Sequence, residues 1–135
     1  MSESLEEQLI HFTRMHDRYI QDWNDAMASG DTSAVERMSE DYSVAFFHGV
    51  KDKPVLFSRA EAVSGLQQSV HELLRAKKVF NHRVIRLKDE SHAVVFYELC
   101  IEKEDQMLAR LFTIEKWELI EGRWMVAGEI EQGIQ

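Results

Sequence analysis

Glu98 is a carboxylate inside a stretch that should form the interior of a sheet. The run from Ala93 to Ile101 is otherwise apolar. A carboxylate buried there would have a raised pKa and could act as a general acid or base near neutral pH. An ion pair with Arg83, or a position facing water at a sheet edge, would explain Glu98 equally well. The sequence leaves these readings open.

Glu115 is a second acid next to an aromatic residue in a predicted strand. It lies two residues before Trp117, so both side chains should point to the same face. Arg83, Glu98 and Glu115 could together hold a polar ligand. The same three residues could instead form a ladder of ion pairs between strands.

His48 ends the pattern "YSVAFFH" and precedes a glycine. A histidine at such a strand end suits the mouth of a pocket, although a lone histidine there could also be structural or exposed. His48 and Glu98 are therefore the candidate general bases, and we expect either one to act without a cofactor.

Several classes of site and partner are not supported by the sequence. It has no glycine-rich phosphate loop, no paired histidines at metal-binding spacing and a single cysteine, Cys100. We therefore expect no metal and no cofactor. The net charge of −8 argues against nucleic acid as a partner. No apolar run is long enough to span a membrane, and the acidic N-terminus and unpaired cysteine lead us to expect a cytoplasmic protein.

The elements that must position these residues begin with helices. Three Ser-x-x-Glu patterns, each typical of a capping box, precede amphipathic stretches. They predict helices over residues 4–28, 33–39 and 59–76. Tyr19 and Trp23 lie on the inner stripe of the first helix, where each could be core packing, a pocket wall or both.

Strands are expected in the rest of the chain, over residues 42–48, 55–57, 78–87, 92–103, 107–120 and 124–131. The links "KDES", "EDQ" and "EGR" are short and polar, which indicates antiparallel hairpins. The fold class is therefore α+β, in a single domain over residues 1–135. A bent, cone-shaped antiparallel sheet of four main strands and one or two shorter ones is covered by a long N-terminal helix and two further helices.

Regular hairpins would divide the strand residues between two faces. One face mixes polar and aromatic side chains, including Phe96 and Trp117, and we expect it to line a pocket. The other face is apolar and suits a homodimer contact through Tyr97, Leu99, Phe112 and Ile114. A single β-bulge would exchange the two faces.

The order of these patterns resembles a known family. The segment "YIQDWNDAMASGDTSAVERMSEDYSVAFFHG" resembles the opening of the nuclear transport factor 2-like (NTF2-like) superfamily, near its SnoaL-like polyketide cyclases, and "KWELIEGRWMVAGEIEQ" resembles its closing hairpin. The resemblance implies an α+β cone around a pocket, usually in a dimer. Because the superfamily includes isomerases, dehydratases, cyclases, hydrolases, transport adaptors and assembly domains, the fold does not settle the function.

We therefore expect a small-molecule-binding domain with an enclosed pocket between the first helix and a curved sheet. A lyase, isomerase or hydrolase using Glu98 or His48 is the first alternative, and a dimeric assembly module is the second. The expected ligand-binding residues are Tyr19, Trp23, His48, Arg83, Phe96, Glu98, Glu115 and Trp117.

Overall fold

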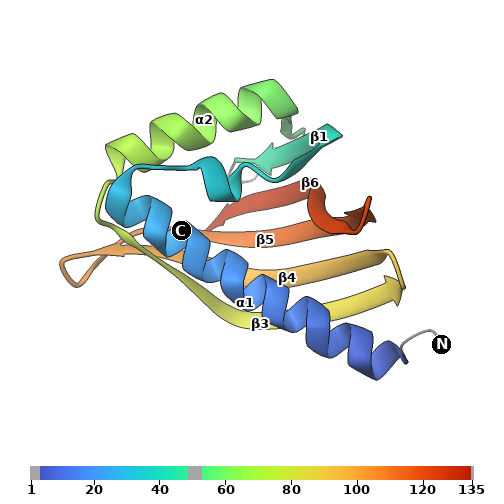
Figure 1. Cartoon of the computed structure of the whole chain (residues 1–135). Coiled ribbons are helices and arrows are strands. Elements are labelled where there is room, and N and C mark those ends of the chain that lie inside the picture. The colour runs from blue at the N-terminus through green and yellow to red at the C-terminus, as the bar shows by residue number, and fades with distance from the viewer. Residues whose placement is uncertain (1–3, 49–52, 135) are drawn as a thin grey trace.

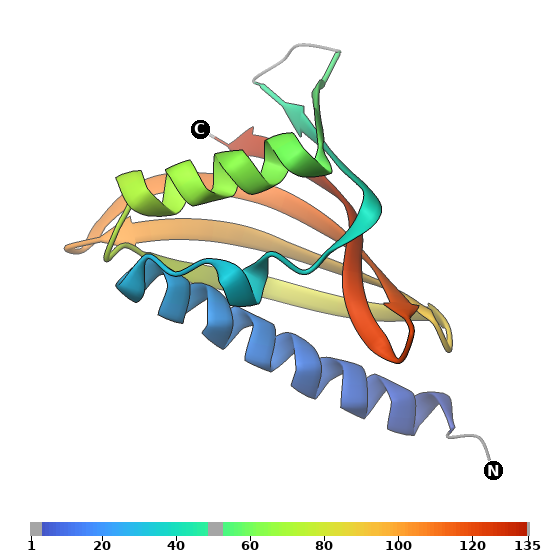
Figure 2. The ribbon, with the colours of Figure 1, turned by 45° about the horizontal axis from the view of Figure 1, so that its top comes forward.

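Six strands form one curved, unclosed sheet, and two α-helices lie against its concave side (Figures 1 and 2). The computed structural model describes residues 4–48 and 53–134. The strand order is β2-β1-β6-β5-β4-β3. This arrangement confirms the α+β cone expected from the sequence. Within the described residues, none of the helices is long and apolar enough to cross a membrane.

The long helix α1, Leu5–Ser29, forms where the sequence predicts it. The Ser4 side chain caps its first turn by accepting a hydrogen bond from the Glu7 N–H. Gly30 ends the helix in the left-handed conformation, with φ of 86°, and its N–H donates to the Ala26 carbonyl. The inner stripe of α1 then lies across the concave face of the sheet.

The predicted second helix over residues 33–39 is wrong. Only a 3-10 turn, η1, forms at Ser33–Val35, and strand β1 begins at Met38 and runs to Phe47. The Ser33 hydroxyl donates to Asp31 and does not cap a helix. Contacts with the last strand replace the expected helix at this point. The Arg37 carbonyl accepts a hydrogen bond from the Val126 N–H, and the Arg37 guanidinium donates to the Trp124 carbonyl.

Strand β2, Val55–Ser58, leads directly into helix α2, Arg59–Glu72. The capping box at its start is present as predicted, since the Ser58 side chain and the Glu61 side chain each bond the other's backbone N–H. The helix ends before the predicted residue 76. Arg75 is in the left-handed region, with φ of 73°, and turns the chain into the sheet.

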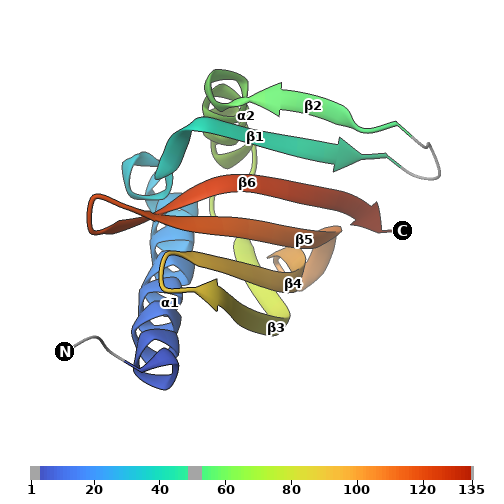
Figure 3. The ribbon, with the colours of Figure 1, turned by 90° about the vertical axis from the view of Figure 1, so that its right-hand side faces the viewer.

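Four long strands follow: β3 (Lys77–Asp89), β4 (His92–Lys103), β5 (Gln106–Ile120) and β6 (Arg123–Ile134). They form the predicted antiparallel meander. Strand β1, however, pairs with β6 in parallel, so the sheet is mixed where we expected it to be antiparallel. Figure 3 shows β1 and β6 side by side, with the two helices on the same side of the sheet.

Five register shifts interrupt the strand pairing, and three of them decide which side chains of the antiparallel meander face inward. The register shifts between Asn81 and Val84 in β3, between Ile101 and Glu102 in β4, and between Lys116 and Trp117 in β5. Each shift changes which side chains of neighbouring strands share a face. The two faces therefore differ from those that regular hairpins would give.

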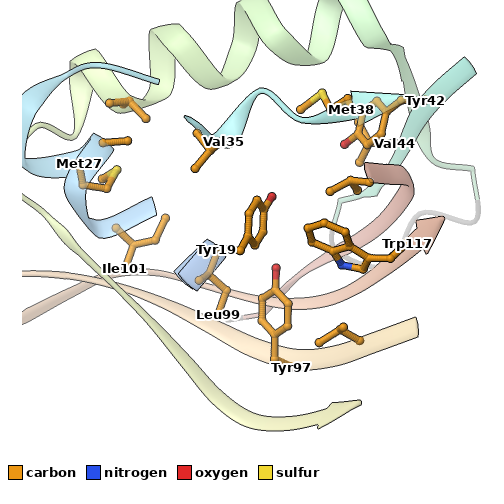
Figure 4. Close-up of a cluster of buried hydrophobic side chains, with 14 of the residues drawn as sticks. Tyr19, Met27, Val35, Met38, Tyr42, Val44, Tyr97, Leu99, Ile101 and Trp117 are labelled. Carbon is orange, nitrogen blue, oxygen red and sulfur yellow. The ribbon is translucent and has the colours of Figure 1, made fainter. Parts of the chain in front are cut away.

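Aromatic side chains form the centre of the core. Phe12 is fully buried and makes edge contacts with the rings of Trp117 and Trp124, with centroids 5.9 and 4.9 Å apart. Tyr19 meets Trp117 edge-on at 4.8 Å. These contacts fix α1 on the sheet, as the buried cluster in Figure 4 shows for Tyr19 and Trp117.

Candidate functional site

A cavity of about 270 Å³ lies between the helices and the concave face of the sheet. Figure 4 shows Tyr19, Tyr42 and Tyr97 around this part of the interior, from α1, β1 and β4. The cavity is close to the lower end of the usual range for small-molecule sites, about 300 to 1,000 Å³. Most of the wall is apolar, and its charged or hydroxyl-bearing residues are Tyr19, Tyr42, Glu61, Ser69, Lys78, Tyr97, Thr113, Glu115, Glu129 and Glu131.

Glu115 is the most heavily hydrogen-bonded acid in the cavity wall. It is 1% exposed, and its Oε1 accepts from His16 Nε2 and from Trp117 Nε1, both at 2.8 Å. Its Oε2 accepts from the Tyr97 hydroxyl. Three donors around one carboxylate hold it rigidly. Glu115 is thus a fixed acceptor that positions Tyr97 at the cavity.

His16 extends this network to the surface. The Arg83 guanidinium can only donate, and its contact of 3.1 Å with His16 Nδ1 makes that nitrogen an acceptor. The other ring nitrogen, Nε2, therefore carries the proton that it donates to Glu115. Arg83 also pairs with Asp17 at 2.7 Å. A continuous chain of polar contacts thus runs from solvent to the cavity wall.

Glu129 and Glu131 on β6 form a second group of acids. In the register of β5 and β6, Glu129 lies opposite Glu115, and Glu131 lies opposite Thr113. The Tyr42 hydroxyl donates to Glu129 at 2.9 Å. Burial, the Glu131 carboxylate and the Glu115 carboxylate raise the pKa of Glu129 well above its usual value. Burial and Glu115 also raise the pKa of Glu131, although the nearby Lys78 opposes that shift.

Lys78 is the cation of the cavity. Burial lowers the pKa of its ammonium from 10.5 to about 8, against the opposing effect of Glu131, Glu129 and Glu115. Its Nζ lies 3.4 Å from the centroid of the Trp23 ring. The Asn24 side chain accepts from the Lys78 N–H and donates to the Lys78 carbonyl. Helix α1 therefore fixes both the backbone and the ammonium of this residue.

Hydroxyl groups complete the polar part of the wall. Burial and the carboxylates of Glu115 and Glu129 raise the pKa of Tyr19 and of Tyr97 well above 10, so both phenols keep their protons. Thr113 is 3% exposed, and its hydroxyl has no hydrogen-bond partner among the described residues. An orphaned buried hydroxyl at a cavity is a position where a ligand would gain a hydrogen bond.

Three of the predicted ligand-binding residues line the cavity: Tyr19, Trp23 and Glu115. Trp117 is buried beside them and donates to Glu115, but it belongs to the core behind the wall. Arg83 was also expected to line the cavity and does not. It acts on the wall only through His16.

The expectation that Phe96, Glu98 and His48 line the cavity is wrong. Phe96 is 41% exposed on the outer face of the sheet, and Glu98 pairs with Arg110 on that same face at 2.7 Å. His48 is exposed and packs on the Phe46 ring. The register shift at Ile101 explains why Phe96 and Glu98 were assigned to the wrong face of β4. It puts the odd-numbered residues of both β4 and β5 on the inner face.

The predicted site residues did not include these residues of the cavity wall: Tyr42, Lys78, Tyr97, Glu129 and Glu131. In "GEIEQ", acids alternate with an apolar residue in the last strand, which is a pattern that could have pointed to Glu129 and Glu131. Lys78 follows another lysine at a strand start, so nothing in the sequence separates it from its exposed neighbour Lys77.

Among the described residues, no group of three or more His, Cys, Asp or Glu side chains is arranged to hold a metal ion. The polar groups of the wall are instead suited to hydrogen bonding, proton transfer and attack by an amine.

The fold matches that of solved structures. An NTF2-like protein of unknown function from Shewanella baltica superposes with a TM-score of 0.68 at 12% identity, covering 99% of each chain. The chain has the NTF2-like fold. A second NTF2-like protein of unknown function, from Silicibacter pomeroyi, gives a TM-score of 0.61 at 14% identity, covering 98% of this chain and 100% of that one. A candidate ketosteroid isomerase from Parabacteroides distasonis gives 0.56 at 16% identity, with coverages of 86% and 85%.

No family model and no curated protein matches the sequence. The NTF2-like fold is thus shown by the structural comparison, and the SnoaL-like branch stays a prediction. Because proteins with this fold differ widely in activity, the chemistry of the cavity must carry the functional argument.

Proposed function

We propose that this protein binds a small, uncharged, largely apolar organic molecule in the NTF2-like cavity. The observation that carries the proposal is the unpartnered hydroxyl of Thr113 in the wall of a preformed cavity of about 270 Å³. Apolar walls with a few convergent polar groups are typical of small-molecule sites.

The charges of the wall select the class of ligand. Four glutamates, Glu61, Glu115, Glu129 and Glu131, line the cavity together with a single cation, Lys78. An anionic ligand would be repelled and would lose its hydration on entry. A molecule with one hydroxyl or carbonyl group could bond to Thr113 or to the Tyr97 phenol while its apolar part contacts residues such as Leu99 and Leu111.

The alternative enzymatic proposal with Glu98 or His48 as base loses its support. Both residues lie outside the cavity, and Glu98 is already paired with Arg110. A general base must lie within hydrogen-bond reach of the proton that it removes from a bound substrate.

Replacing Thr113 by valine tests the binding proposal. The variant removes an unsatisfied hydroxyl at constant shape, so the free protein should become more stable by about 1 kcal/mol. Its affinity for the bound alcohol or ketone should fall by about tenfold. Calorimetric titration with a panel of uncharged aromatic and alicyclic alcohols and ketones, with the matching carboxylic acids as negative probes, measures the affinity.

A blocking variant and a matched control complete this test. Gly65 lies on α2 at the cavity, and a Cβ placed there would contact nothing within 4 Å. Gly65→Phe should therefore obstruct the cavity, whereas Gly65→Ala should keep binding and stabilise α2 by up to about 1 kcal/mol. If no member of the panel binds to the wild-type protein, or if Gly65→Phe leaves binding unchanged, the proposal fails.

We also propose that a second copy of the chain covers the outer face of the sheet. Phe96, Phe112 and Val84 are 41 to 56% exposed on this face. The Glu98–Arg110 pair lies among them and offers charges of both signs to a two-fold-related copy. Tyr97 and Leu99, which we expected in this contact, face the cavity instead. Phe112 and Ile114 do lie on the outer side.

The outer-face proposal predicts that Phe112→Glu converts the dimer to a monomer, because two carboxylates would be buried in the contact. Analytical ultracentrifugation at micromolar protein measures the mass. Leu56→Glu is the control, since Leu56 is 68% exposed on β2, at the sheet edge. A wild-type monomer, or a Phe112→Glu dimer of unchanged stability, would rule this contact out.

A further inference from the structure

Lys78 is the residue of the cavity whose placement the binding proposal leaves unexplained. Burying an ammonium is costly unless it is paired. Among the described residues, Lys78 forms no ion pair with any of the four glutamates of the wall. Its only close polar contact is the face of the Trp23 ring. An amine held at a cavity without a hydrogen-bond partner is available to a ligand.

The position of the Lys78 amine is set from two sides. Asn24 holds the Lys78 peptide through two hydrogen bonds, at 3.0 and 3.2 Å. Trp23 precedes Asn24 on α1, and the centroid of its ring lies 3.4 Å from the Lys78 Nζ. The long and flexible side chain is therefore restrained at both ends, which lowers the entropy lost when the amine meets a reactant.

The groups around Lys78 control its protonation. From β5 and β6 it faces Glu115, Glu129 and Glu131 across the cavity, from α1 Tyr19, from α2 Glu61, and from β1 Tyr42. Burial outweighs the attraction of the carboxylates and lowers the pKa of Lys78 to about 8. An appreciable fraction of the amine is then neutral and nucleophilic near neutral pH, as in lysines that form imines.

We propose that Lys78 is a nucleophile that forms an imine with an aldehyde or ketone bound in the cavity. This rests on the proposed binding function and narrows its ligand to a carbonyl compound. The neutral amine attacks the carbonyl carbon, a C–N bond forms, and the carbonyl electron pair moves to oxygen. After a proton shift from nitrogen to oxygen, the product of this step is a neutral carbinolamine.

Loss of water then needs an acid, and Glu131 is placed to supply the proton. The Glu131 side chain forms no hydrogen bond or ion pair with any residue in the described part of the chain, and burial raises its pKa, which favours the protonated acid. It protonates the carbinolamine hydroxyl, the C–O bond breaks, and water leaves as the nitrogen lone pair forms the C=N bond. The resulting iminium cation lies near the Glu131 carboxylate just formed.

Reductive trapping tests the proposal. Wild-type protein is incubated at pH 7.5 with 3-phenylpropanal and cyanoborohydride, which reduces the iminium to a stable secondary amine, and the modified residue is found by peptide mass mapping. We expect Lys78 to be modified at least about tenfold faster than Lys77, because the exposed Lys77 is a matched neighbour with the usual reactivity. The mapping needs no variant, so it does not depend on how a variant folds.

Variants and a non-reactive ligand separate the steps. Lys78→Met should abolish the preferential labelling, and Lys77→Met should leave it unchanged. Glu131→Gln should slow labelling by about tenfold while 3-phenylpropan-1-ol still binds. If the alcohol binds but Lys78 is labelled no faster than Lys77, imine formation is overturned and the binding function stands. If neither the alcohol nor the aldehyde binds, both proposals fail.

Discussion

Replacing Glu115 by leucine should lower the free energy of unfolding by about 3 to 5 kcal/mol. The substitution removes the common acceptor of three buried donors, His16 Nε2, Trp117 Nε1 and the Tyr97 hydroxyl. Each donor belongs to a residue that is at most 7% exposed and would then be left without this partner. Chemical denaturation monitored by tryptophan fluorescence and by circular dichroism measures the loss.

Two other substitutions show that the loss comes from the network. Glu115→Gln keeps the shape and one acceptor oxygen, and should cost about 1 to 3 kcal/mol. Glu40→Leu removes an exposed acid from β1 and should change stability by no more than about 0.5 kcal/mol. A Glu115→Leu protein as stable as the wild type would mean that the carboxylate contributes no net stabilisation.

Replacing Lys78 by methionine should change how stability depends on pH. The pKa of this ammonium is about 8 in the folded chain and 10.5 when unperturbed. Between these values the unfolded chain binds more protons than the native one, so raising the pH stabilises the native state. The wild type should therefore gain about 2 kcal/mol relative to Lys78→Met between pH 8 and pH 10.

Denaturation of both proteins at half-unit pH steps measures this difference. Taking the difference removes the contribution of groups that do not interact with Lys78, including the tyrosines, whose raised pKa values act in the opposite direction above about pH 10. Lys77→Met is the matched control, and the difference in free energy of unfolding between it and the wild type should stay constant across this pH range. A constant wild-type minus Lys78→Met difference across this range would show that the ammonium is not desolvated.

The fold could be predicted because its determinants are local. The capping serines at residues 4 and 58, the Gly30 helix end and the short polar links each specify one boundary. The failed helix at residues 33–39 shows the limit of that logic. Its capping pattern is present, but β1 gains backbone hydrogen bonds by pairing with a strand from the other end of the chain.

The site was harder to predict because it depends on whether the odd-numbered or the even-numbered residues of each strand face inward. Glu98 and Tyr97 are adjacent, and only the register shift at Ile101 decides that Tyr97 faces inward. A second shift, between Lys116 and Trp117, makes Glu129 the partner of Glu115, and both residues line the cavity. His82, with φ of 58°, lies at a third register shift, between Asn81 and Val84. The residue types there do not indicate a β-bulge.

The parallel pairing of β1 with β6 has a consequence for the order of assembly. Met38 and Val126 are partners, so one of the first strands made by the ribosome finds its neighbour only after nearly all of the chain has emerged. Until then the edge of β1 has unsatisfied backbone groups and the cavity lacks Glu129 and Glu131. Folding should be slow for a chain of this size and is complete only when the last strand docks, so any segment that stops before Arg123 cannot form the complete cavity.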